Sequence, residues 1–381
     1  MHKKKLRKIL LFISVILTIV LAALVALYFF SPEPPSEAIK TSREAIQKAK
    51  KAGAGLYAPE TLKKTEKYYQ EALAEWEKQN NTFTLKRDFT RLQELIEHSR
   101  KSAETAHQES IEVKETLQTE SGKLLKELQK SLEETPSFYN KLPLPQNIFK
   151  KHSQTQILLT EARNNIQSGN YRKAVTQLQT AREYHSLYQE YAGNLLKEYF
   201  SSQSLWNQWL KETIQWSRNH PGPAIIVDKI AHTCMIYEKG KLIRTFNAEL
   251  GRNWIGQKLY QGDQATPEGK YHVNKKQNLG SSKYHKALLI NYPNPSDTER
   301  FRQNKAKGVI QKNARIGGLI EIHGGGGQGH NWTEGCIALE NKDIDHLFSR
   351  CTIGTPVTII GSARPLEEIL QQDNAAGPSP R

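Results

Sequence analysis

Cysteine is scarce in this chain of 381 residues, which has only three: Cys234, Cys336 and Cys351. No two of them form a Cys-x-x-Cys pair, so a structural zinc site is not expected. An odd count leaves at least one thiol free in an oxidising exterior. Cys234 alternates with apolar neighbours and is expected in a core, and Cys351 is expected to be structural. The sequence does not decide whether these two cysteines form a disulfide.

A basic stripe with interleaved aromatic side chains is also absent, although the formal net charge is +15. Five basic residues stand in the first eight positions, MHKKKLRK, with no acid among them. The remaining excess is spread over the chain, so nucleic acid is not expected as a partner. A mildly cationic exterior suits an anionic neighbour such as cell wall or a membrane surface.

The basic start precedes an apolar run from Ile9 to Phe30, which only Ser14, Thr18 and Tyr28 interrupt. As a helix this run would extend about 33 Å and cross a bilayer. The positive flank is expected to stay in the cytoplasm. Residues 1–30 therefore predict a single-pass anchor that inserts residues 9–30 in the inner membrane, with the rest in the periplasm. A cleaved signal peptide is the alternative, but no clear A-x-A site precedes SPEPPS.

The middle of the chain predicts an all-α region. Residues 31–36, SPEPPS, form a short Pro-rich linker. Residues 37–220 are rich in Ala, Leu, Glu, Lys and Gln, and their apolar residues recur at helical spacing. A bundle or long antiparallel hairpins are expected, broken near residues 52–55, 80–81, 135–145 and 168–170. This periplasmic region is expected to be a spacer; the alternative is a module that binds an envelope protein.

The periodicity changes after NHPGP, and residues 221–365 predict a mostly β domain. AIIVDKIAHTCMIYEKGKLIRTFNAEL is rich in β-branched residues and carries a Lys239-Gly240 turn, which indicates a hairpin. Further short apolar runs follow: YHVNK, ALLINYP, IGGLIEIHG and PVTIIG. Residues 366–381 are a C-terminal tail, whose end, DNAAGPSPR, is expected to be disordered.

One stretch concentrates reactive residue types: HGGGGQGHNWTEGCIAL, from His323 to Leu339. A cysteine nucleophile must be ionised, and a neighbouring imidazole takes its proton or stabilises the thiolate. His323 ends an apparent strand, and a loop from it could return Cys336 beside the imidazole. Backbone amides at Gly335 and Cys336 could then face an acyl oxyanion. A metal site formed by His323, His330 and Cys336 is an equal alternative on spacing alone.

Several segments of the β domain occur in an order that resembles the L,D-transpeptidase catalytic domain. They are VDKIAHTCMIYEKGKLIRTFNAELG, GDQATPEGKYHV, INYPNPSD, IEIHGGGG and WTEGCIALEN. The resemblance implies a β-sandwich, with Cys336 as nucleophile and His323 as base. It implies that the Gly324 carbonyl orients the imidazole and that the Gly335 and Cys336 amides lie near the oxyanion. The Ser/Thr and downstream Asn positions of the family are Thr333 and Asn341, and both are candidate substrate-binding residues. No metal or organic cofactor is implied.

Two positions depart from the common pattern of the family. Glu334 stands where many members have histidine, and Ala338 where many have arginine. The GCIAL version resembles a subgroup of Gram-negative type. Because Ala338 carries no charge, Arg252 or Lys258 is the candidate partner for a substrate carboxylate. His330 and Trp332 lie in the same loop and are candidate substrate-lining residues.

These features predict a membrane-anchored enzyme that acts on peptidoglycan stem peptides. Cys336 would form a thioester with a tetrapeptide stem, and an amine on another stem or on a protein would resolve it. An L,D-carboxypeptidase or amidase that resolves the thioester with water is a second hypothesis. A non-enzymatic scaffold that binds peptidoglycan is a third.

Overall fold

The computed structural model describes residues 2–278, 280–281 and 283–375. The chain divides into two compact units. The first comprises Met1–Lys130 and Gln154–Arg182, and the second Ser131–Ser153 and Glu183–Arg381. The unit that contains the sheet therefore includes helical segments on the N-terminal side of residue 221, and the predicted boundary at residue 220 does not coincide with this division.

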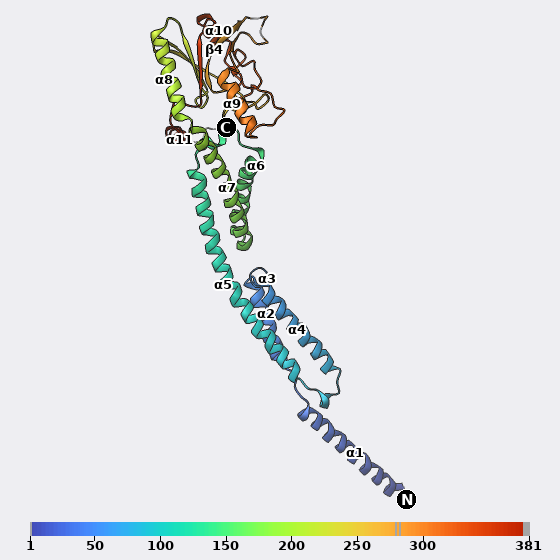
Figure 1. The fold of residues 1–381 in the computed structure, drawn as a ribbon. Helices are drawn as coiled ribbons and strands as arrows, with labels where there is room; N and C mark the ends of the chain where they lie inside the picture. The colour runs from blue at the N-terminus through green and yellow to red at the C-terminus, as the bar shows by residue number, and fades with distance from the viewer. Residues whose placement is uncertain (1, 279, 282, 376–381) are drawn as a thin grey trace. The chain divides into compact units, whose positions relative to one another are not determined.

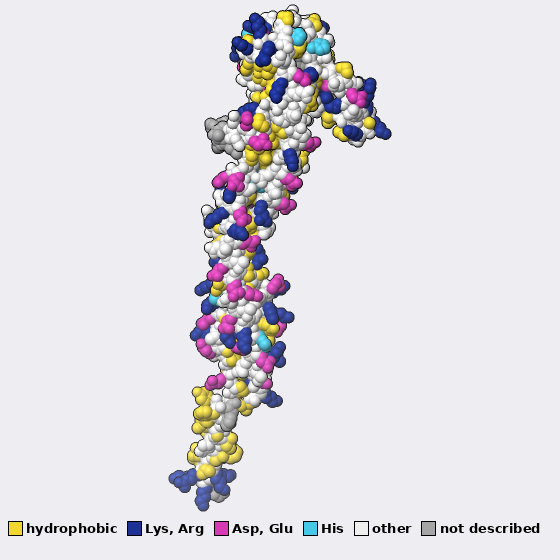
Figure 2. Space-filling model, turned by 60° about the vertical axis from the view of Figure 1, so that its left-hand side comes forward, with side chains coloured by type: hydrophobic (Ala, Val, Ile, Leu, Met, Phe, Trp, Pro, Cys, Tyr) yellow, Lys and Arg dark blue, Asp and Glu magenta, His cyan; other side chains and the backbone are white. Residues whose placement is uncertain are grey.

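The chain begins with the apolar helix α1 (His2–Phe30). Its Lys3–Phe29 segment has a mean hydropathy of 3.1 over its most apolar window, and that window is not buried against other parts of the chain. Figure 2 shows its apolar side chains at the surface, with Lys and Arg side chains at its N-terminal end. Length and composition fit a membrane anchor and a signal sequence alike.

Four helices and a 3₁₀ turn form most of the first unit. They are α2 (Ser36–Lys51), α3 (Ala54–Tyr57), α4 (Pro59–Asn80), η1 (Thr84–Lys86) and the N-terminal part of α5 (Thr90–Glu134). The α4 and α5 helices approach closely through small side chains, since Thr65 Oγ1 lies 2.8 Å from Ser102 Oγ. The 45-residue α5 is twice as long as the 22-residue α4, and the predicted long hairpins are not confirmed.

Two further helices, α6 (Gln146–Gln167) and α7 (Tyr171–Phe200), are joined by a three-residue turn. Gly169 adopts a positive φ of 72° in this turn, and its carbonyl accepts a hydrogen bond from Tyr57 Oη. The helices α2, α4, α5 and α6 end at Lys51, Asn80, Glu134 and Gln167, which confirms the four predicted breaks.

The second unit is built on eight strands in the order β3-β2-β1-β8-β4-β5-β6-β7. The strands are β1 (Ala224–Asp228), β2 (Thr233–Glu238), β3 (Lys241–Asn247), β4 (Gly269–Gln277), β5 (Ala287–Ile290), β6 (Glu321–His323), β7 (Ile337–Ala338) and β8 (Pro356–Ile360). Lys239 and Gly240 both have positive φ between β2 and β3, which confirms the predicted hairpin turn.

The strand pairing does not confirm the expected β-sandwich. Through Gly269–His272, β4 pairs with β8, and through Val273–Gln277 it pairs with β5. All eight strands therefore belong to one continuous sheet. The sheet curls, because Glu249, just after β3 at one edge, bridges Ala338 of β7 at the other edge.

Helices cover the sheet within the second unit (Figure 1). The α8 helix (Gln203–Asn219) packs on β1, β2 and β8, and α10 (Asn341–Arg350) packs on β5. The 3₁₀ helix η2 (Ser137–Lys141) contacts α11 (Leu366–Ala375). One apolar core joins these elements and contains Phe138, Tyr188, Trp206 and Ile226.

A buried carboxylate connects the helices to the sheet. Glu268 accepts hydrogen bonds from Tyr199 Oη at 2.8 Å, Trp206 Nε1 at 3.0 Å and Lys229 Nζ at 2.8 Å. The side chains of Lys229 and Glu268 are 0% and 5% exposed. Because both charges are buried, each depends on the other and on these donors.

Three helices of the second unit were not predicted. Asn294 and Asp297 form a capping box at the start of α9 (Pro295–Ala306), within the NPSD of INYPNPSD. The α10 helix buries Ile344 and Leu347. The tail prediction is wrong for 373–375, which lie in α11, and residues 376–381 lie outside the described residues.

Glu268→Ala should lower the free energy of unfolding of the second unit by about 3–5 kcal/mol, because it leaves the Lys229 ammonium buried without its counter-ion. Urea unfolding followed by tryptophan fluorescence would measure the change. Glu212→Ala is the matched control: its carboxylate pairs with Lys270 at the surface, so the expected loss is below about 1 kcal/mol. Equal losses in the two variants would contradict the role of Glu268.

Candidate active site

Two adjacent parallel strands position Cys336 and His323. Ile322 of β6 pairs with Ile337 of β7, and His323 pairs with Ala338. Cys336 directly precedes β7. Since side chains alternate along strands and Ile322 and Ile337 point into the core, His323 and Cys336 share the opposite face. With strands about 4.8 Å apart and a rise of about 3.3 Å per residue, such diagonal neighbours have α-carbons roughly 8 Å apart, within reach of a thiol and an imidazole.

The His323 imidazole is held in one tautomer. Its Nδ1 lies 2.7 Å from the Gly324 carbonyl, which can only accept, so Nδ1 carries the proton. Nε2 is then the basic atom, and it is buried without a hydrogen-bond partner among the described residues. Burial lowers the pKa of His323, the hydrogen bond to Gly324 partly opposes this shift, and the charge of Lys283 adds to it; the net shift is downward. The resting imidazole is therefore neutral near pH 7.

Aromatic rings enclose this imidazole on two sides. The Tyr284 ring stacks on it at 3.6 Å between centroids and 10° between planes. The Trp332 ring meets it edge-on at 5.9 Å and 70°. These contacts limit rotation of the imidazole and keep Nε2 in one direction. Tyr284 was not predicted, since no pattern near it in the sequence indicated a link to His323.

The Cys336 thiol is protonated in the resting site. Burial raises its pKa to about 11, an effect that the backbone of Glu321 and, to a smaller extent, the charge of Lys258 oppose. The thiol lies 3.6 Å from the carbonyl of Leu319, a residue with φ of 57°. A thiol with a raised pKa next to a neutral imidazole fits activation by proton transfer rather than a preformed ion pair.

The turn before the cysteine is set by Thr333 and Gly335. The Thr333 hydroxyl donates to the Cys336 carbonyl at 2.7 Å and accepts from the Gly335 amide at 3.2 Å. Gly335 has φ of +127°, and a Cβ there would lie 2.6 Å from the Ala265 carbonyl oxygen. The Gly335 amide is thus engaged by Thr333 and does not point freely toward an oxyanion in this conformation.

Asn341 supports the turn that follows the histidine. Its Oδ1 accepts from the Gly325 amide at 2.9 Å. A Cβ at Gly324 would lie 2.6 Å from the same oxygen, so only glycine fits there. The close contact places Asn341 beside Gly324, whose carbonyl orients His323, and the substrate contact predicted for Asn341 stays a prediction.

Glu249 organises the loop between the histidine and the cysteine, and sequence reasoning missed it. One of its carboxylate oxygens accepts from the Gly329 amide at 2.6 Å, and the other from Trp332 Nε1 at 2.7 Å. The carboxylate therefore fixes the ring that meets His323. His330 is exposed, and its Nδ1 lies 3.1 Å from the Gln328 carbonyl. No local pattern reveals Glu249, since its partners lie about eighty positions away.

The two cations proposed for a substrate carboxylate already have partners. Arg252 lies 3.8 Å from Glu334, and both side chains are exposed. Lys258 is buried and pairs with Asp263 at 2.6 Å. The Lys258 ammonium is thus neutralised inside the protein, whereas Arg252 would have to exchange its contact with Glu334.

All three cysteines are free, so the Cys234–Cys351 disulfide is not formed, and both of these thiols are 0% exposed. Within the described ranges, no cluster of three or more His, Cys, Asp or Glu residues is arranged to hold a metal ion.

Residues 222–359 match the family model of the L,D-transpeptidase catalytic domain (YkuD). Every site residue described above lies inside this range, so this part of the chain is similar to that catalytic domain. The match does not extend to the helical region.

Individual proteins are similar over shorter stretches. The Escherichia coli (strain K12) protein YafK, named as a suggested L,D-transpeptidase, is 33% identical over 98 residues, or 26% of this chain. The aligned stretch covers 32% of YafK, so the chain spans about a third of that relative. Its counterpart in Escherichia coli O157:H7 gives the same values.

Solved structures were found as well. The helical cell shape determining protein Pgp2 from Campylobacter jejuni is 24% identical with a TM-score of 0.28, covering 41% of this chain and 53% of its own. Mycobacterium tuberculosis L,D-transpeptidase 1 is 20% identical with a TM-score of 0.24. This match covers 37% of the present chain and 62% of the Mycobacterium tuberculosis chain.

Iodoacetamide should alkylate Cys336 slowly at pH 7, at about a hundredth of the rate of a free cysteine, because only the thiolate reacts and a pKa of about 11 leaves little of it. The rate should rise about tenfold per pH unit up to pH 10. Mass spectrometry would measure it, with Cys336→Ala as the control. A plateau below pH 8 would show a preformed ion pair instead.

Glu249→Ala should speed hydrogen exchange of residues 327–332 about tenfold, because the Gly329 amide and the Trp332 indole lose a charged acceptor. Exchange followed by mass spectrometry of peptides from this loop would measure it. Glu238→Ala removes a carboxylate that pairs with Arg350 and serves as the control. Unchanged exchange in the Glu249 variant would contradict the role of this carboxylate in holding the loop.

Proposed function

We propose that this chain is a membrane-anchored peptidoglycan L,D-transpeptidase with Cys336 as its nucleophile and His323 as its base. The observation that carries the proposal is the tautomer of His323: Nδ1 is bound to the Gly324 carbonyl and Nε2 is left as an unpartnered base on the face that Cys336 shares. The match of residues 222–359 to the family model supports the reaction class.

In the proposed acylation, His323 Nε2 takes the proton of the Cys336 thiol. The thiolate attacks the carbonyl of the L-centre of diaminopimelate in a tetrapeptide stem. The carbon–nitrogen bond to the terminal D-Ala breaks, and the imidazolium returns its proton to the leaving amine. The products of this half-reaction are a thioester and free D-Ala.

In the second half-reaction, an amine of another stem or of a wall-linked protein attacks the thioester. His323 accepts the amine proton, the carbon–sulfur bond breaks, and the thiolate is reprotonated. If water attacks instead, the same site is an L,D-carboxypeptidase. Exclusion of water from the thioester separates the two reactions.

Residues 9–30 would anchor the protein in the inner membrane, with the catalytic domain in the periplasm. The helical region would then act as a spacer or bind an envelope protein. The GCIAL sequence at Cys336 supports the assignment to the Gram-negative type of the family.

The detergent-solubilised full chain, incubated with a disaccharide-tetrapeptide carrying diaminopimelate, should form a Cys336 thioester and then a crosslinked dimer that lacks one D-Ala. Intact-protein and product masses would be measured together. Cys336→Ala should abolish both species, and His323→Gln should slow thioester formation by about 10²–10⁴-fold, the usual contribution of a general base.

Tripeptide without dimer would assign the hydrolytic reaction to the same site. Thioester formation that persists in Cys336→Ala would refute the assignment of Cys336 as the nucleophile. Absence of both thioester and product in the unmodified protein would favour a non-enzymatic scaffold.

A further inference from the structure

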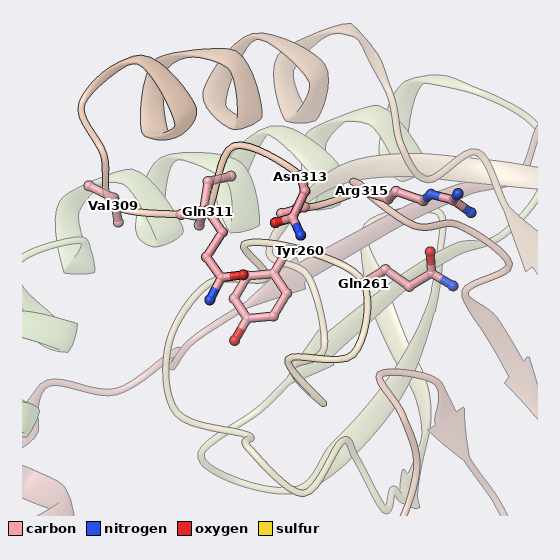
Figure 3. A pocket seen from close by; sticks show the side chains of 8 residues that line it. Tyr260, Gln261, Val309, Gln311, Asn313 and Arg315 are labelled. Carbon is pink, nitrogen blue, oxygen red and sulfur yellow. The ribbon is translucent and has the colours of Figure 1, made fainter.

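A polar pocket of about 540 Å³ lies between two loops of the second unit (Figure 3). One wall is formed by Tyr260 and Gln261, and the other by residues 309–311 and 313–315. Arg315 and Gln261 extend in the same direction at one end, whereas Tyr260 and Gln311 lie at the other (Figure 3). None of the site residues predicted from the sequence lines this pocket.

The lining has the chemistry of a site for a carboxylate on a peptide. It offers one guanidinium, from Arg315, and the amides of Gln261, Gln311 and Asn313. No acidic side chain is among the described residues that line the pocket. Amide groups donate to and accept from peptide bonds, and a guanidinium binds a carboxylate through two parallel hydrogen bonds.

Arg315 is available for such a ligand. Its side chain is exposed and forms no ion pair with any described residue. In contrast, Arg252 faces Glu334 and Lys258 is buried against Asp263. Arg315 would therefore gain a counter-ion from the substrate without giving one up.

Both walls of the pocket continue to the nucleophile. From Gln261, the first wall continues to Ala265, whose carbonyl oxygen abuts Gly335 next to Cys336. From Arg315, the second wall continues to Leu319, whose carbonyl lies 3.6 Å from the Cys336 thiol. A Cβ at Gly317 would lie 3.2 Å from Gln261 Cβ, so the two walls approach closely between Arg315 and Leu319.

The pocket is also preorganised. Asp263 accepts from the Leu259 amide at 2.6 Å and the Tyr260 amide at 3.1 Å, which fixes the first loop. The Gln261 amide donates to the Arg315 carbonyl at 2.8 Å and ties the two walls together. A ligand would therefore order few groups on binding, which favours affinity.

We propose that this pocket binds a carboxylate-bearing part of the peptidoglycan stem peptide, with Arg315 as the partner of the carboxylate. This inference rests on the proposed function and supplies the charge that Ala338 lacks. Arg315 is a binding residue here and takes no part in proton transfer.

The test uses the full chain with Cys336→Ala, which cannot turn over, and two probes: the tetrapeptide L-Ala-γ-D-Glu-diaminopimelate-D-Ala, and the same peptide with its carboxylates converted to carboxamides. Calorimetry would measure both dissociation constants. Amidation should weaken binding at least about tenfold, the effect of losing a charged hydrogen bond. With Arg315→Gln added, the acid should bind about tenfold more weakly and amidation should have little further effect.

Arg302→Gln is the matched control, since it removes the same charge from an exposed position of α9 outside the pocket. It should preserve the preference for the acid, and Arg315→Lys should preserve part of it. An acid preference of the same size in Arg315→Gln, or no binding of the tetrapeptide at all, would overturn the proposal.

A separate measurement of D-Ala release by protein with intact Cys336 distinguishes failure of the pocket proposal from failure of the proposed function. Suppose that D-Ala is released but Arg315 has no effect on the preference for the tetrapeptide with free carboxylates. The proposed function would then stand, and the carboxylate-binding role of the pocket would be refuted. An Arg315-dependent preference without D-Ala release would keep the pocket and remove the catalytic function.

Discussion

The buried pair of Glu268 and Lys229 holds together the parts on which the candidate site rests. Glu268 binds Tyr199 of α7 and Trp206 of α8, which attaches these helices to the sheet. The Lys229 ammonium also donates to the Thr266 carbonyl at 2.9 Å. Burying two charges is costly unless every polar atom has a partner, so these segments have little freedom to move apart.

From Thr266 the constraint passes to the nucleophile. The Thr266 hydroxyl accepts from the Gly251 amide at 3.0 Å, and Gly251 bridges Thr333. Gly335 fits against this segment only because it lacks a Cβ. A loop rich in glycine would otherwise be mobile. Its position therefore depends on backbone contacts with a segment that the buried pair fixes.

Electrostatics in the site favour a neutral resting pair. Burial acts in opposite directions on the two groups, raising the pKa of the Cys336 thiol and lowering that of His323. Both shifts favour the uncharged forms. Charge would appear only as substrate enters and the proton moves. Arg252 and Lys258 each already face a carboxylate of the protein.

Local signals in the sequence determined much of the architecture. The apolar run of α1, the helix breaks and the Lys239-Gly240 hairpin were predictable because periodicity and turn residues act over a few positions. The proximity of His323 and Cys336 was also predicted, since a single loop joins them. Tertiary structure alone decided the partners, such as Glu249 for Trp332 and Asp263 for Lys258. These contacts depend on how segments distant in the sequence pack together, and the residues next to a side chain in the sequence do not determine that packing.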